Sequence, residues 1–266
     1  MTTLNNTLQP ITERGWQSGF KNLLANEYTL WWGGRRWIKS ALIWLAVING
    51  FIFLIAFAST HDPSMTPENV VSTAIGVFVN IGVFATSIGI VVGSQGAIIR
   101  EKQLGTAAWV LSKPASRTAF IFAKWLAYSV SSLIISLTFP AIVFLIQSQL
   151  FWKQIPAPGQ FVESWLIMAL NLQFYLALTL MLGTIFSARG PVAGIGISFL
   201  FAGSLLPLVL PEWITLLFPW MLQKLAETIA LGKPLPEGWV IPVIATVVWI
   251  LIFMGIALWR FGREEF

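Results

Sequence analysis

The sequence predicts an all-α integral membrane protein with six transmembrane helices. Three observations carry this prediction: the chain is very apolar, its charged residues are separated by long uncharged segments, and its cations fall mainly on one predicted side. Of 266 residues, 56% are hydrophobic and 10% are charged, and the mean hydropathy is +0.77. Water-soluble domains carry roughly 25% charged residues. We therefore expect residues 1–266 to form a single membrane domain.

The six spans are predicted from six segments without Asp, Glu, Lys, Arg or His. Each has about 20 residues or more, enough for a helix to cross a hydrocarbon core of roughly 30 Å. A charge at mid-helix costs on the order of 2.5–3.5 kcal/mol, which several apolar residues are needed to offset. Membrane-spanning strands are alternating segments of about ten residues, unlike these continuous runs. The helices are expected at about 40–60, 70–99, 118–152, 164–188, 190–211 and 238–259.

Lysine and arginine predict the orientation. With six crossings, thirteen of the 16 Lys and Arg residues lie on the side of both termini and three on the other. Because cytoplasmic segments carry the excess of cations, both termini are expected in the cytoplasm, and the chain in the plasma (inner) membrane. The basic residues border the spans and do not form a separate face, so the net charge of +5 does not predict nucleic-acid binding.

Two segments outside the spans have apolar residues near helical spacing. In 1–39 this pattern predicts an amphipathic helix on the cytoplasmic interface, followed by a turn at Gly33 and Gly34. In 212–237 it predicts a short interfacial or re-entrant helix outside the cytoplasm. The apolar residues are Trp16, Phe20, Leu23, Leu24 and Trp31 in the first segment and Met221, Leu222, Leu225 and Ile229 in the second, interleaved with charged or polar residues that include Glu13, Lys21, Glu27, Gln223, Lys224 and Glu227.

Small residues recur every four positions in the second and fifth predicted helices. Such stripes let helix backbones approach closely. They serve either packing within the chain or a dimer seam or closing pathway, and both readings stay open here. Pro140 and Pro207 each remove a backbone donor and are expected to kink their helices. The stripes consist of Ala85, Gly89, Gly93 and Ala97, and of Gly190, Gly194, Ser198 and Ala202.

Motifs for catalysis, metal binding and ATP binding are missing from the sequence. His61 is the single histidine and the chain has no cysteine, so an HExxH zinc site is excluded. A GxSxG nucleophile motif is absent. The one Gly-Lys pair, Gly232-Lys233, is followed by Pro234 where a P-loop needs Ser or Thr. We expect no enzyme activity, no metal and no cofactor bound by this chain.

The six uncharged segments contain neutral polar residues but no Asp, Glu, Lys, Arg or His. Proton and ion pathways commonly use ionisable residues at membrane depth, so their absence weighs against a pump that works alone. Each neutral polar residue is expected to form hydrogen bonds between helices rather than to contact a substrate. These residues include Asn49, Asn80, Gln95, Gln147, Asn171, Gln173 and Thr179.

The segment 100–124 reads REKQLGTAAWVLSKPASRTAFIFAK and resembles the permease subunits of type-2 ABC exporters. That family has roughly E-x-x-x-G-T, then L, P, S-R and K. The predicted topology, with an amphipathic segment before the first crossing, six crossings and a long outside segment before the last, also resembles this family over nearly the whole chain. The matching residues are Glu101, Gly105, Thr106, Leu111, Pro114, Ser116, Arg117 and Lys124.

The resemblance implies that two permease chains pair and that two cytoplasmic ATPase subunits, which bind ATP and Mg²⁺, dock beneath them. The 100–117 loop would couple the permease to the ATPase subunits. In it, Gly105 can end the extension of the second helix and Thr106 can cap a short helix that presents charged residues to the partner. Lys124 is taken as a charge that simply flanks a span. The coupling residues would be Arg100, Glu101, Lys102, Gly105, Thr106, Pro114, Ser116 and Arg117.

Two other functions stay open beside an ABC permease of exporter type. A stand-alone carrier or channel would show internal repeats or a charged ring, and neither is evident. A non-transporting assembly subunit is compatible with the same sequence. A membrane enzyme would need nucleophiles, acids or metal ligands at membrane depth, which the predicted spans do not contain.

Overall fold

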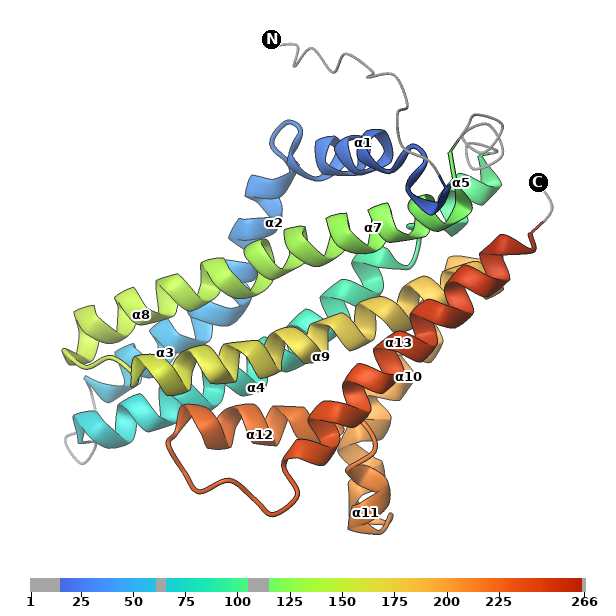
Figure 1. Cartoon of the computed structure of the whole chain (residues 1–266). Coiled ribbons are helices and arrows are strands. Elements are labelled where there is room, and N and C mark those ends of the chain that lie inside the picture. The colour runs from blue at the N-terminus through green and yellow to red at the C-terminus, as the bar shows by residue number, and fades with distance from the viewer. Residues whose placement is uncertain (1–14, 61–65, 105–114, 265–266) are drawn as a thin grey trace.

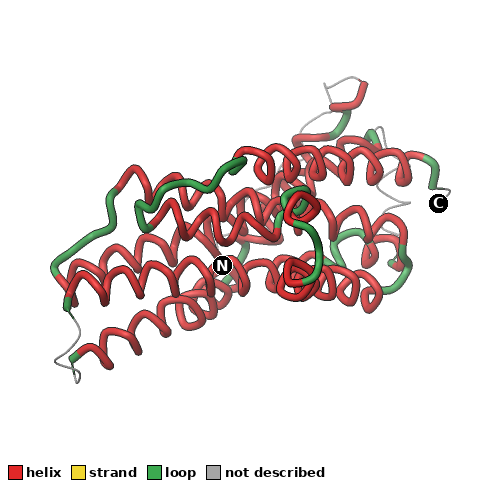
Figure 2. Tube along the Cα trace, turned by 90° about the horizontal axis from the view of Figure 1, so that it is seen from below, coloured by secondary structure: helices red, strands yellow, loops and turns green. Residues whose placement is uncertain are grey.

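The computed structural model describes residues 15–60, 66–104 and 115–264, and all regular structure in these ranges is helical (Figures 1 and 2). In chain order the elements are η1 (Gly15–Gln17), α1 (Phe20–Trp32), α2 (Arg36–Trp44), η2 (Leu45–Asn49), α3 (Gly50–Ser59), α4 (Pro67–Ser94), α5 (Ile99–Gln103), α7 (Arg117–Ser132), η3 (Leu133–Thr138), α8 (Phe139–Trp152), α9 (Pro158–Ile185), α10 (Arg189–Leu205), η4 (Leu206–Leu208), α11 (Glu212–Thr215), α12 (Trp220–Ala230) and α13 (Val240–Gly262).

Six helical segments among the described residues are long and apolar enough to cross a membrane, which confirms the predicted number. Their ends differ from the uncharged segments because charged residues also continue the helices at the two surfaces. The fourth span, for example, begins before the exposed Glu163. The segments are Arg36–Ser59, Glu68–Gln103, Arg117–Trp152, Pro158–Ile185, Arg189–Leu208 and Val240–Gly262.

The helix α9 lies at the centre of the bundle. In its most apolar stretch 78% of the residues are buried inside the chain, against 17% in the span that contains α10 and 28% in α13. It packs against α4, α12 and α13, and Figure 1 shows it running between them. The outer helices instead expose large apolar side chains such as Phe53, Ile146 and Leu251. This distribution suits a bundle whose outer surface faces lipid, because lipid is as apolar as the side chains.

Two spans change from α-helix to π-helix near their middle. The π-helical segments are η2 in the first span and η3 in the third, and η3 ends just before Pro140. Proline has no backbone N–H, so the regular helical ladder cannot continue through it. The Pro140 carbonyl accepts a hydrogen bond of 3.0 Å from Asn49 Nδ2, which also donates to Gln147 Oε1 at 3.0 Å. The sequence predicted a kink at Pro140 but not the π-helical segment before it.

Two other spans are interrupted near their ends. A turn at 95–98 separates α4 from α5, so the second span is not the uninterrupted helix that the sequence predicted. In the fifth span α10 ends at Leu205, and Pro207 lies in the 3₁₀ segment η4. The break at Pro207 was expected from the missing N–H of proline.

Neutral polar residues join the spans, as the sequence predicted for most of them. Asn171 Nδ2 in α9 donates to Ser87 Oγ in α4 at 2.9 Å. Asn80 in α4 donates to Glu227 Oε2 at 2.9 Å and accepts from Gln223 Nε2 at 2.6 Å, which fixes the polar face of α12 against α4. The apolar face of α12 packs on α9. Thr179 and Gln173 differ from the prediction. The Thr179 hydroxyl bonds to the carbonyl of Tyr175 in its own helix, and the buried side-chain amide of Gln173 has no hydrogen-bond partner among the described residues.

The first and last described elements meet at one end of the bundle, which we call the basic end. It comprises η1, α1, α5, the start of α7 and the end of α13. Gly33 caps α1 by donating to Thr29 O at 2.8 Å, and Gly34 has a φ of 70°, a conformation that glycine adopts without strain. The chain turns there from α1, which lies across the basic end, into α2 (Figure 1).

Candidate functional site: the polar network at the basic end

A buried lysine joins three elements at the basic end. Lys124 of α7 is 2% exposed, and its Nζ lies 2.5 Å from Glu27 Oε1 of α1. The same Nζ contacts Glu101 Oε1 of α5. We call these three residues the buried triad. Isolated charges are costly in an apolar interior, so each carboxylate helps to hold its helix, α1 or α5, against Lys124 of α7.

The buried triad corrects two sequence interpretations. Lys124 was taken as a flanking charge, but it is buried and ion-paired. Glu27 was assigned to the charged side of an amphipathic helix, but it is the buried residue of α1. The signal was present: Leu23, Glu27 and Trp31 are four residues apart, so they share one helix face. Trp31 on that face meets Tyr128 of α7 edge-on, with ring centroids 5.1 Å apart.

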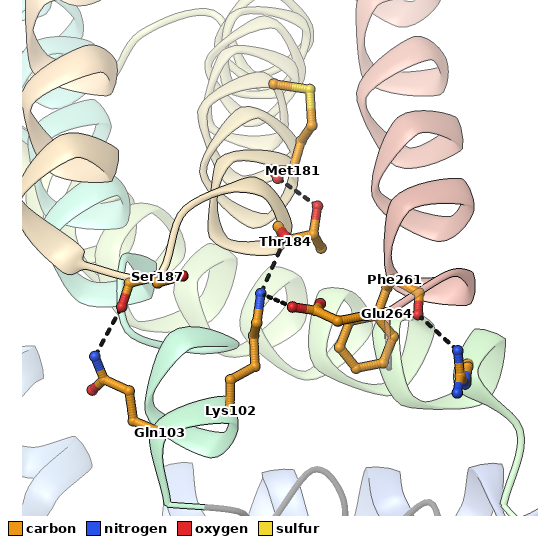
Figure 3. A network of polar contacts seen from close by, with 8 residues as sticks. Lys102, Gln103, Met181, Thr184, Ser187, Phe261 and Glu264 are labelled. Carbon is orange, nitrogen blue, oxygen red and sulfur yellow. Dashed lines mark hydrogen bonds and ion pairs between the residues drawn. The ribbon is translucent and has the colours of Figure 1, made fainter. Parts of the chain in front are cut away.

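The short helix α5 is also tied to α9 and α13 (Figure 3). Lys102 Nζ lies 2.6 Å from Glu264 Oε1 and donates to the carbonyl of Thr184 at 3.1 Å. Gln103 Nε2 donates to the carbonyl of Ser187 at 2.9 Å. These bonds satisfy carbonyls at the end of α9, where the helix has run out of its own donors. As a result α5 cannot move independently of three spans.

The start of α7 is held in the same way. Ser116 is its N-cap: the side chain accepts from Ala119 N at 2.9 Å and also contacts the carbonyl of Trp16. Its backbone N–H donates to Ser18 O at 2.9 Å. Arg117 donates to the carbonyl of Gly262 at 2.6 Å, which places a cation on the C-terminal end of α13. Cations are favoured at that end of a helix.

The predicted coupling residues that the structure describes therefore lie at the basic end, but several face inward. Glu101, Lys102 and Arg117 each contact another part of the chain, where the sequence suggested that they point toward a partner. Arg100 is exposed, and so is Leu104, the residue after α5, at 64%. Gly105, Thr106 and Pro114, together with Leu111, lie outside the described residues. The contributions of Glu27, Leu104 and Glu264 were missed by sequence reasoning.

The two small-residue stripes have different surroundings. In the second span, Ala97 is buried, Ala85 is half-buried, and a Cβ at Gly89 would lie 2.3 Å from the Trp44 ring. These residues serve packing within the chain, whereas Gly93 faces open space. The stripe of α10 points outward: Gly190, Gly194 and Ser198 are exposed, Ala202 is half-buried, and a Cβ at either glycine would meet nothing within 4 Å.

Within the described ranges, no group of three or more His, Cys, Asp or Glu residues is placed to hold a metal ion. Residues 37–266 match the model of a family described as "Protein of unknown function (DUF2705)". The chain belongs to this family. The DUF2705 region includes Glu101 and Lys124 of the buried triad, while Glu27 lies before it. No curated protein matches the chain.

Proposed function

We propose that this DUF2705 chain is the membrane-spanning permease subunit of an ATP-driven type-2 ABC transporter of exporter type. ATP and Mg²⁺ would be bound by separate ATPase subunits, and this chain would bind no cofactor. The observation that carries the proposal is the anchoring of α5. This short helix forms the start of the 100–117 segment, which resembles a coupling loop, and its side chains contact α7, α9 and α13.

The anchoring of α5 suits a rigid coupling element. Force applied by an ATPase to α5 and the loop beyond it would reach three other spans through the buried triad, Lys102 and Gln103. Rigid-body rotation of such a block is a common form of switching. In this proposal the charges of Glu101 and Lys102 hold α5 in place, and the surface offered to the ATPase includes the exposed Leu104.

The membrane setting follows from the same proposal. The basic end would face the cytoplasm, because it carries most of the cations, and the membrane would be the plasma (inner) membrane. There α1 would lie at the membrane interface beneath the ATPase. At the opposite end α12 would cover the bundle outside the cytoplasm as an interfacial or re-entrant helix.

The second permease chain would pack on α10. This helix exposes Gly190, Gly194 and Ser198 in one stripe, and only 17% of the most apolar stretch of its span is buried inside the chain. Small residues let two helix backbones come close in a membrane. We therefore place the dimer seam at the α10 stripe, and assign the stripe of the second span to packing within the chain.

Co-purification with an ATPase tests the proposal. The chain would be co-expressed with a candidate P-loop ATPase and purified through a tag on this chain alone. We expect a complex of two chains of each kind with ATPase activity. Leu104→Asp should lower the amount of bound ATPase about tenfold or more, since each 1.4 kcal/mol of lost contact is a factor of ten. Glu101→Ala and Arg117→Ala should reduce the coupling of ATP hydrolysis to the permease.

The control is Leu235→Asp, the same substitution at a 42% exposed leucine between α12 and α13. It should leave ATPase binding unchanged. If the chain purifies without an ATPase in every mild detergent, the permease proposal is wrong, and a stand-alone carrier or an assembly subunit becomes the better candidate. If both leucine variants bind the ATPase as well as the unmodified chain does, α5 is not the docking element.

A further inference from the structure

Two adjoining cavities form a groove between the α1–α2 pair and the helices α4, α5 and α7, which we call the lateral groove. Each cavity has a volume of about 360 Å³, and small-molecule sites have roughly 300–1,000 Å³. Trp31, Ser40 and Gly93 line both cavities, so one continues into the other. The groove is thus open from the basic end down into the apolar part of three spans.

The cavity nearer the basic end, which we call the upper cavity, is cationic. Arg36, at the start of the first span, and Arg100, near the end of the second, both line it. The guanidinium group of neither arginine forms an ion pair or hydrogen bond with another residue of the described ranges. Glu27 also lines this cavity, but its charge is matched by Lys124. The buried triad contributes two carboxylates and one cation, and Arg36 and Arg100 contribute two more cations. Together these five groups carry a net charge of one positive unit at the mouth of the groove.

The other cavity, which we call the lower cavity, is apolar. Its walls include Ile43, Trp44, Ile90 and Ile135. The hydroxyls of two of the three serines that line it are already used: Ser132 Oγ donates to Tyr128 O at 2.6 Å, and Ser136 Oγ to Ser132 O at 2.7 Å. These two side chains add little polarity to the wall. From Arg36 to Trp44 the helix rises about 12 Å at 1.5 Å per residue, so the groove pairs a cationic mouth with an apolar slot of that depth.

We propose that the lateral groove binds one anionic phospholipid of the bilayer. Its phosphate would accept hydrogen bonds from Arg36 and Arg100, and one acyl chain would occupy the lower cavity. The arginine guanidinium is well suited to phosphate, and a monoanionic head group balances the one excess positive charge. A soluble anion would leave the apolar slot unfilled. A zwitterionic lipid such as phosphatidylcholine also offers a phosphate, but its choline cation would leave the excess positive charge at the mouth unbalanced. The proposal requires only that the spans cross a membrane, not that the chain is a permease.

Lipid binding by the purified chain tests the charge at the mouth. The delipidated chain in mild detergent would be titrated with dioleoyl phosphatidylglycerol or with dioleoyl phosphatidylcholine, and bound lipids counted by native mass spectrometry. We expect one phosphatidylglycerol bound at least tenfold more tightly than phosphatidylcholine. The double variant Arg36→Gln, Arg100→Gln should lose this preference. The charge-matched control, Arg35→Gln with Arg260→Gln, should keep it, because neither residue lines the groove.

A steric variant tests the slot. Gly93 lines both cavities, and a Cβ added there meets no atom within 4 Å. Gly93→Leu should therefore fill the groove without displacing its walls and should lower phosphatidylglycerol binding about tenfold. The matched control is Gly255→Leu in α13, where an added side chain also meets open space, and it should bind lipid normally.

Several results would overturn the proposal. One is equal affinity for the two lipids in the unmodified chain. Another is loss of the preference in the arginine variant with normal binding in Gly93→Leu, which would place the lipid on the surface of the basic end. Displacement of phosphatidylglycerol by millimolar inorganic phosphate would indicate a soluble ligand. A dimer that dissociates only in Gly93→Leu, with no bound lipid in any variant, would assign the groove to a second copy of the chain.

Discussion

Lys124 lies between the carboxylates of Glu27 and Glu101, which come from two elements far apart in the sequence. Its Nζ also sits 4.9 Å from the centre of the Phe120 ring, and that ring stacks on Phe261 of α13. A cation in such surroundings is stable only with its anionic partners, because removal of one partner leaves a buried charge uncompensated. The side chain is therefore a structural element of the basic end.

Substitution of Lys124 should show this directly. Lys124→Met should destabilise the chain by about 3–5 kcal/mol, toward the lower figure because Glu101 is partly exposed. Glu27→Gln should have a smaller effect, since Lys124 keeps its contact with Glu101. The apparent Tm of the detergent-solubilised chain, followed by tryptophan fluorescence, measures both. The triple variant Glu27→Gln, Lys124→Met, Glu101→Gln should recover much of the loss, and a triple variant as unstable as Lys124→Met would contradict the argument.

The contacts of individual side chains were harder to predict from the sequence than the long helices. A lysine at the border of a span gives no sign in the sequence of whether it reaches water or another helix. Its partners, Glu27 and Glu101, are 97 and 23 positions away. The helix face shared by Leu23, Glu27 and Trp31 was the available clue. The inward direction of Lys102 depends on Glu264, which only the packing of α13 beside α5 brings near.

At the scale of elements, α12 is fixed on α10 by one close contact. The Trp220 ring lies over Gly203, where an added Cβ would be 2.3 Å from the nearest ring atom, and Trp220 Nε1 donates to the carbonyl of Phe199 at 3.1 Å. The ring also stacks on Phe218 with centroids 4.6 Å apart. Glycine at this position is what allows the ring to approach the backbone of α10.

Gly203→Ala should therefore push α12 away from α10. We expect a destabilisation of about 1–3 kcal/mol, typical of overpacking in a filled site, measured as a lower apparent Tm in detergent. Gly255→Ala is the control, because its Cβ would enter open space. That variant should be neutral or more stable by up to about 1 kcal/mol, from the higher helix propensity of alanine. Equal effects of the two substitutions would argue against the contact with Trp220.

The existence of the long helices followed from the sequence because a charge is so costly at membrane depth. Their interruptions were less visible. Pro140 and Pro207 marked two breaks, but nothing in the sequence around 95–98 distinguishes the turn between α4 and α5 from continued helix. The π-helical form of η2 and η3 depends on bonds between spans, such as that from Asn49 to Pro140, and these appear only once the helices are packed.

At the scale of the whole molecule, the orientation of the bundle can be tested with single cysteines, because the chain contains none. Arg35 and Gln154 are exposed at opposite ends of the bundle. We expect Gln154→Cys to react with a membrane-impermeant maleimide on intact cells. Arg35→Cys should react only after permeabilisation, with labelling at least about tenfold lower before it, because positive residues remain in the cytoplasm. The reverse pattern would place the basic end outside.

The position of α9 at the centre of the bundle has a consequence for how the chain is made. Synthesis proceeds from the N-terminus, so three spans precede α9 and two follow it. Early in translation Asn171 has not yet been made, so Ser87 lacks this partner, and Lys102 has no Glu264 until α13 leaves the ribosome. The basic end is thus completed only after α13 has been made, and a chain stalled before α13 would display an unfinished surface that a quality-control protease could recognise.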